Sequence, residues 1–291
     1  MGITRFGDLL RAAQRGGYAV GSFNSLNLEM VRGVLAAAEE ARAPVILCHA
    51  EVHSQLTPLV SIAPIMINEA RRANVPVALL LDHGVSFEAC VQALQLGLNA
   101  VMFDGSELPY EENIRQTAEM VRIAHAMGAE VEAELGHVTR PEGGGSGVAG
   151  ESHDQSDTDL YTNPQQAAEF VSRTGVDALA VAFGTAHGLY VKKPELDFAR
   201  LDDIRSRVEV PLVMHGGTGL SEAEFQRAIQ GGVAKINYYT GMSRAAGRTL
   251  RDKYGPMEGD VFLHDMLVDT IAAVKQDAQA AMKCFGCFGK A

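Results

Sequence analysis

Residues 75–105 read VPVALLLDHGVSFEACVQALQLGLNAVMFDG, and they contain one complete repeat of a pattern that runs through the chain. The apolar run over 75–82 predicts a strand, the amphipathic run over 87–96 predicts a helix ended by Gly97, and residues 100–104 predict a second strand. Both strands show little alternation of apolar and polar residues, which is typical of parallel strands buried on both faces. The stretch therefore predicts a strand–helix–strand unit of a parallel sheet.

The same alternation of short apolar runs and longer amphipathic runs continues on both sides of this unit. The eight expected strands are residues 19–24, 44–50, 75–82, 100–104, 130–135, 178–183, 211–215 and 234–239. The helices expected between them are residues 28–41, 59–73, 87–96, 110–126, 165–174, 198–207 and 221–230. Eight is the number of parallel strands that closes a barrel, so we expect an α/β fold with a single (β/α)8 TIM barrel.

Two segments depart from this rhythm. A Gly-rich loop over about 136–163 follows the fifth strand, and a loop of this length is typical of a moving lid or of disorder. A helical pattern over about 259–285 lies beyond the eighth unit, where it could close one end of the barrel or pack against a neighbouring subunit. Residues 1–291 are interpreted as one domain.

Charge and composition narrow the classes of partner. The formal net charge of the 291 residues is −11, whereas nucleic acids and anionic membranes attract basic surfaces. The sequence has neither a signal peptide nor an apolar run long enough for a bilayer. Cys284 and Cys287 form a C-x-x-C pair with no second pair nearby, which favours a structural or incidental role in a reducing compartment. We therefore expect a cytoplasmic protein that acts on a small molecule.

Three histidines follow expected strands at the end of a barrel where chemistry takes place. His83 and His187 follow the third and sixth strands and His215 ends the seventh, so we expect their imidazoles to converge on one rim. Three such imidazoles make a catalytic Zn²⁺ site that leaves a position open for substrate. Asp104 and Glu134, from the fourth and fifth strands, are candidates for orienting these ligands or for an alternative metal position.

These residues also have structural interpretations. A single His after a strand is more often a hydrogen-bonded structural residue, and Asp104 could cap a helix; the convergence of three His is what favours a metal. Glu132 and Glu134 alternate with apolar residues, so both face the barrel interior and need a cation or a hydrogen-bond network. Among the other six histidines, only His49 is kept as a further candidate.

Glycine-rich turns accompany two of the histidines. Gly188 follows His187, and Gly216, Gly217 and Thr218 follow His215. Loops after the last barrel strands commonly bind phosphate through backbone N–H groups and a helix N-terminus. Plain turns between strand and helix are the alternative interpretation.

At these positions the chain resembles the class II (zinc-dependent) fructose-bisphosphate and tagatose-bisphosphate aldolases. The matching stretches occur in the same order over most of the chain, and as a set they are highly specific. They are GSFN at 21–24, LDHG at 81–84, FDGS at 103–106, EAELG at 132–136, YTNP at 161–164, GTAHG at 184–188, HGGTGL at 215–220 and KIN at 235–237.

The resemblance implies an aldolase that reversibly cleaves a ketose 1-phosphate or bisphosphate into dihydroxyacetone phosphate and an aldehyde. It implies one Zn²⁺ on the three histidines, Asp82 as the acid/base on the C4 hydroxyl, and Glu134 near an alternative metal position. It implies a proton-transfer role for a lid glutamate, for which Glu142 and Glu151 are the candidates. The implied substrate-binding residues, with a monovalent cation often alongside, are Asn24, Gly188, Gly216, Gly217, Thr218, Asn237, Tyr238, Tyr239 and Thr240. By the same analogy we expect a homodimer or homotetramer.

Three departures concern the far end of the substrate. The eighth strand ends in Asn-Tyr-Tyr-Thr, which places Tyr239 where the family separates fructose from tagatose substrates. Residues 254–258 read YGPME where relatives often carry a basic segment for the far phosphate, and the lid loop is longer than usual. We therefore expect a ketose 1-phosphate whose distal end differs from the usual bisphosphates.

Three rival functions are left open by the sequence. A Schiff-base aldolase would use Lys235, which lies on the eighth strand, and would need no metal. Another barrel metalloenzyme, a hydrolase or epimerase acting on a sugar phosphate, would use the same three histidines to activate water. A non-catalytic binding protein would keep the fold alone.

Overall fold

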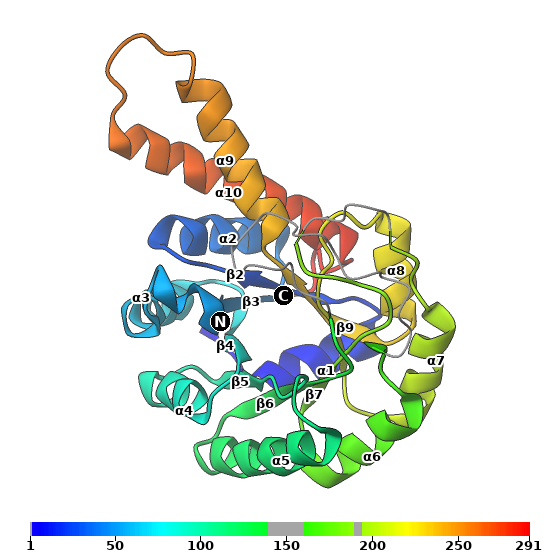
Figure 1. The fold of residues 1–291 in the computed structure, drawn as a ribbon. Coiled ribbons are helices and arrows are strands. Elements are labelled where there is room, and N and C mark those ends of the chain that lie inside the picture. Colours follow the sequence, from blue (N-terminus) through cyan, green and yellow to red (C-terminus); the bar gives the residue numbers. More distant parts are fainter. Residues whose placement is uncertain (1, 139–159, 189–193) are drawn as a thin grey trace.

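The strands of the computed structural model form one parallel sheet that closes on itself, and the model describes residues 2–138, 160–188 and 194–291. Strands β2 to β9 form the barrel, because β2 pairs with both β3 and β9 while β4 pairs with β5 (Figure 1). The strands are β1 (Gly2–Ile3), β2 (Val20–Asn24), β3 (Val45–Ala50), β4 (Pro76–Gly84), β5 (Ala100–Phe103), β6 (Glu130–Leu135), β7 (Ala178–Val181), β8 (Leu212–Met214) and β9 (Val233–Tyr238). The expected TIM barrel is confirmed, with β1 as an added short strand on β4.

Helices cover the outside of the barrel between successive strands (Figure 1). They are α1 (Phe6–Gly16), α2 (Leu28–Ala41), α3 (Leu59–Arg72), α4 (Phe87–Leu96), α5 (Tyr110–Ala126), α6 (Pro164–Thr174), α7 (Phe198–Arg207), α8 (Glu222–Gln230), α9 (Thr240–Tyr254) and α10 (Leu263–Cys284), with the short 3-10 helix η1 (Glu51–Gln55). Gly97 and Gly175 end their helices in the left-handed conformation, as the sequence predicts. Among the described residues, no helix is both long and apolar enough for a membrane span.

The barrel interior is closed at the amino ends of the strands. Helix α1 packs against β2, β4 and β9, and Gly7 N–H donates to the Glu130 carboxylate at 2.7 Å. Glu130 is the first residue of β6, so α1 lies across the end of the barrel opposite the strand carboxyl ends. Fully buried aromatic side chains lie between the strands and the outer helices, where Phe103 packs against Phe87 of α4 and Phe183 against Phe198 of α7. The carboxyl end is left for a site.

Helices α9 and α10 form an arm that extends away from the barrel (Figure 1). Helix α10 packs against α2 and α9, so the expected C-terminal segment lies along the side of the barrel and does not cover its end. Large apolar side chains are exposed around the turn of the arm, including Phe262 (59%) and Leu263 (69%). We name residues 257–268 the arm tip.

Candidate metal centre

Two adjacent residues of β4 both reach the cavity at the carboxyl end of the barrel. In a regular strand neighbouring side chains point to opposite faces. The pairing of β4 with β5 shifts register between Leu81 and Gly84, and His83 takes a left-handed backbone with φ +46°. A bulge of this kind re-aims side chains. As a result both Asp82 and His83 line the same cavity.

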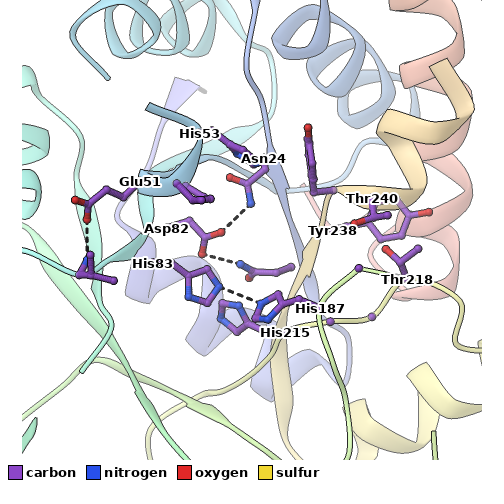
Figure 2. Close-up of a pocket in the computed structure, with 18 of the residues that line it drawn as sticks. Asn24, Glu51, His53, Asp82, His83, His187, His215, Thr218, Tyr238 and Thr240 are labelled. Carbon is purple, nitrogen blue, oxygen red and sulfur yellow. Dashed lines mark hydrogen bonds between the residues drawn. The ribbon is translucent and has the colours of Figure 1, made fainter. Parts of the chain in front are cut away.

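Three imidazoles meet in this cavity, as the sequence predicts (Figure 2). His83 Nε2 lies 3.2 Å from His187 Nε2, and the His83 and His215 ring centroids are 4.5 Å apart. Tetrahedral Zn²⁺ with Zn–N bonds of about 2.0–2.1 Å holds its ligand nitrogens about 3.3 Å apart. His215 Nδ1 is buried and has no hydrogen-bond partner among the described residues. The donor set therefore fits a metal ion.

Acidic groups orient two of the imidazoles. His83 Nδ1 lies 2.7 Å from Asp104 Oδ2, and His215 Nε2 lies 3.1 Å from Glu132 Oε1. Asp104 accepts a hydrogen bond from Ser106, whereas helix α5 starts later, after Pro109, so Asp104 is not its cap. Carboxylates that fix the ring orientation of histidines are typical of metal sites.

The electrostatic field of the site favours a cation. Burial alone would lower the pKa of His83, but the neighbouring carboxylates of Asp82, Asp104 and Glu134 outweigh it and raise this pKa to about 9. A field that favours a proton on the imidazole also favours a metal ion beside it. His83, Asp104 and Glu134 form a second group of ligand atoms close enough for an ion, and Asp104 and Glu134 are the residues for which the sequence suggests an alternative metal position.

Asp82 is held by two amides. Asn24 Nδ2 donates to its Oδ2 at 2.7 Å, and Asn237 Nδ2 donates to its Oδ1 at 2.8 Å (Figure 2). Burial would raise the pKa of Asp82, but His83, His215, Lys235 and the Asn24 hydrogen bond lower it well below its usual value. The carboxylate is therefore ionised and oriented, which is the state that a general base needs.

Lys235, the candidate for a Schiff base, is buried in the barrel below Asn237 and Asp82. It is 0% exposed, its ammonium is 2.8 Å from Glu132 Oε2, and it is not among the cavity residues. A nucleophilic lysine must reach a carbonyl as a free amine. The geometry therefore disfavours the Schiff-base rival.

The cavity has a volume of about 460 Å³. Its lining residues are Asn24, Ala50, Glu51, Val52, His53, Gln55, Asp82, His83, Val85, His187, Gly188, His215, Gly216, Gly217, Thr218, Asn237, Tyr238, Tyr239 and Thr240. Every sequence-predicted substrate residue is therefore at this cavity, although the Tyr238 ring packs against Phe23 and Phe285. Asp104 and Glu134 lie outside this lining, behind His83.

The turn at Gly216 lets the backbone after β8 approach the backbone at Ala186 closely. Gly216 has φ +72°, and a Cβ atom there would lie 2.3 Å from the Ala186 carbonyl oxygen. Only glycine therefore fits between the β8 and β7 loops. Thr218 and Thr240 lie together on one side of the cavity, across Asp82 from Glu51 (Figure 2).

The opposite wall is η1, which the sequence analysis missed. Glu51 fixes this wall by accepting hydrogen bonds from Val85 N at 2.7 Å and Ser86 Oγ at 3.2 Å. His53 lines the cavity with its ring 4.8 Å from that of Tyr239, whereas His49, the residue kept as a candidate, is fully buried and does not line it. The available signal was the run of polar residues directly after a strand, at the catalytic end.

The two lid candidates, Glu142 and Glu151, lie outside the described residues, as does most of the predicted lid. Their roles therefore stay predictions.

Comparison with known proteins gives one consistent result. The family model described as "Fructose-bisphosphate aldolase class-II" matches residues 4–290. The chain is 41% identical to "Uncharacterized protein YdjI" of Escherichia coli K12 over 94% of both proteins. It is 39% identical to a fructose-bisphosphate aldolase of Geobacillus stearothermophilus over 100% of this chain and 99% of that protein. The crystal structure of the YdjI aldolase has a TM-score of 0.87 at 38% identity and 99% coverage of both chains. The chain belongs to the class II fructose-bisphosphate aldolase family.

Proposed function

We propose that this protein is a metal-dependent aldolase, an aldehyde-lyase that reversibly cleaves a ketose 1-phosphate or bisphosphate into dihydroxyacetone phosphate and an aldehyde. The observation that carries the proposal is the position of Asp82. An ionised carboxylate, held by two amides, lies directly beside three imidazoles whose ring nitrogens are close enough to one another to hold a metal ion. Carbon–carbon cleavage needs this combination of a base and an electron sink.

The site residues have separate roles in metal binding and proton transfer. His83, His187 and His215 would hold Zn²⁺, with Asp104 and Glu134 behind them for the alternative metal position. A bound Zn²⁺ would supply Lewis-acid polarisation of the substrate carbonyl. Asp82 takes the proton of the C4 hydroxyl during cleavage and returns it during condensation. After cleavage, Glu142 or Glu151 would donate a proton to the carbanionic three-carbon fragment, which gives dihydroxyacetone phosphate.

The dihydroxyacetone-phosphate end lies on the side of the glycine turns. Gly188 and residues 216–218 line this side with Thr240, and backbone N–H groups are suited to a phosphate. A monovalent cation on this side of the cavity would offset the negative charge of the substrate phosphate. The whole chain would act as one catalytic domain.

The experiment that tests this function is release of dihydroxyacetone phosphate from a panel of ketose 1-phosphates and 1,6-bisphosphates. We expect release from at least one ketose 1-phosphate, and the best substrate identifies the aldehyde half. Zinc-loaded protein that releases it from no substrate would point to a hydrolase or epimerase.

His53 is expected to contribute to recognition of the aldehyde half. It lines the cavity with its ring 4.8 Å from that of Tyr239, and burial lowers its pKa, so a neutral imidazole faces the cavity. His53→Ala should raise KM for the ketose phosphate about 5- to 10-fold, the effect of one lost hydrogen bond. Exchange of dihydroxyacetone phosphate protons with deuterated water should be unchanged. His264→Ala, on the arm tip, is the control. Equal losses in cleavage and exchange would contradict this placement.

The arm tip is expected to bind a second copy of the chain. Phe262, Leu263 and Val268 expose apolar surface that monomers seldom leave uncovered. We therefore expect a homodimer or homotetramer, and the double variant Phe262→Asp/Leu263→Asp should sediment as a smaller species in analytical ultracentrifugation. Met127→Asp, at an exposed apolar residue that directly follows α5, should not. Identical sedimentation of the wild type and the double variant would refute this interface.

A further inference from the structure

A buried lysine lies beneath the candidate site, and no step of the proposed reaction uses it. The Lys235 ammonium is 2.9 Å from Glu132 Oε1 and 2.6 Å from Asn237 Oδ1. The second Glu132 oxygen lies 2.8 Å away. An ammonium has three donors and no acceptor, and a buried one is costly unless it is paired. Lys235 is therefore committed to these two side chains.

The contact between Lys235 and Asn237 fixes the orientation of the Asn237 amide. An asparagine side chain can present either its oxygen or its nitrogen to a neighbour. Because an ammonium only donates, Lys235 holds the amide oxygen of Asn237 toward itself, and the nitrogen then faces Asp82. That nitrogen donates to Asp82 Oδ1 at 2.8 Å. Without the ammonium only the Asp82 carboxylate would select this orientation, and the amide would be held at one end alone.

The contact between Lys235 and Glu132 acts on His215. Glu132 Oε1 accepts from Lys235 and also lies 3.1 Å from His215 Nε2. A carboxylate that is paired with an ammonium only accepts hydrogen bonds, so the Nε2 proton of His215 points toward it. The lone pair is then on Nδ1, the nitrogen left without a partner in the described structure. The hydrogen bond of one ring nitrogen thus determines which nitrogen can bind a metal.

We propose that Lys235 is a positioning residue that orients Asp82 through Asn237 and His215 through Glu132 with one ammonium. The inference rests on the proposed function. It differs from a purely structural ion pair, because replacing both partners of such a pair with uncharged groups is often neutral or even stabilising. The two interpretations therefore disagree about the double variant.

The test compares Lys235→Met, Glu132→Gln and the double variant. The readouts are kcat, KM, zinc affinity by chelator competition, and the midpoint of thermal unfolding. Lys235→Met should lower kcat about 100-fold and zinc affinity about 10-fold, the range seen when partners of metal ligands are removed. KM should change by less than about 3-fold, because substrate binding is left in place. The double variant should regain thermal stability but neither kcat nor zinc affinity.

The matched control is Arg11→Met. Arg11 pairs with Glu130, which lies on the same strand as Glu132 but at the opposite end of the barrel, so kcat and zinc affinity should not change. If Lys235→Met does not fold, the double variant alone distinguishes the positioning role from a purely structural ion pair. A double variant with wild-type kcat and zinc affinity would overturn the proposal. Wild-type protein that releases no dihydroxyacetone phosphate would reject the proposed function instead, while zinc affinity would still test the Glu132 contact.

Discussion

Asp82→Asn is expected to lower kcat for ketose-phosphate cleavage about 10³-fold, within the range for loss of a positioned general base. The amide has nearly the same shape, but it cannot take the proton of the C4 hydroxyl. Its neighbours Asn24 and Asn237 both donate to the native carboxylate, so one of them would also face an amide nitrogen. Steady-state cleavage rates measure the effect.

Proton exchange distinguishes this role from general damage. Exchange of dihydroxyacetone phosphate protons with solvent involves no C4 hydroxyl, so Asp82→Asn should retain it while cleavage is lost. Asp177→Asn is the matched control, because Asp177 also accepts a hydrogen bond from an amide N–H, in its case the Val131 backbone, but lies at the other end of the barrel. Near-normal cleavage by Asp82→Asn would remove Asp82 from the mechanism.

Removal of the metal is the second large effect. Treatment with a chelator should lower cleavage by on the order of 10³-fold or more, because a Lewis acid contributes several kcal/mol to the transition state. Added Zn²⁺ should restore it, and metal analysis should give one ion per chain. His215→Ala should lose both the ion and the activity, since His215 Nδ1 is a buried nitrogen suited to a ligand role.

His125→Ala is the control for the histidine variant. His125 pairs with Asp177 on an exposed face, so the variant should keep its zinc and its cleavage rate. Cleavage that is insensitive to chelation, together with covalent trapping by borohydride, would favour a lysine enzyme instead.

The barrel and the three histidines could be predicted from the sequence because both depend on patterns of short range. Buried parallel strands need continuous apolar runs, and the carboxyl ends of such strands meet at one rim. His83, His187 and His215 could thus be grouped without any knowledge of strand register.

The features that were missed depend on tertiary contacts. Helix η1 has five residues, too few for a periodic pattern, and it is held by the Glu51 contacts with Val85 and Ser86. The β4 bulge results from pairing with β5, which no local pattern specifies. His49 and His53 were ranked in the wrong order for the same reason, since only the turn into η1 determines which of them lines the cavity. Helix α9 was also not predicted.

Strand β6 carries three acidic residues, Glu130, Glu132 and Glu134, that all lie buried at successive levels of the barrel. Glu130 is bound by α1, 123 residues earlier in the chain, and Glu132 by Lys235, 103 residues later. Glu130 cannot be buried favourably until the N-terminal helix is in place, nor Glu132 until the last barrel strand is in place. A half barrel would therefore hold an uncompensated buried charge, which makes closure of the barrel cooperative and its folding dependent on contacts between residues far apart in the chain.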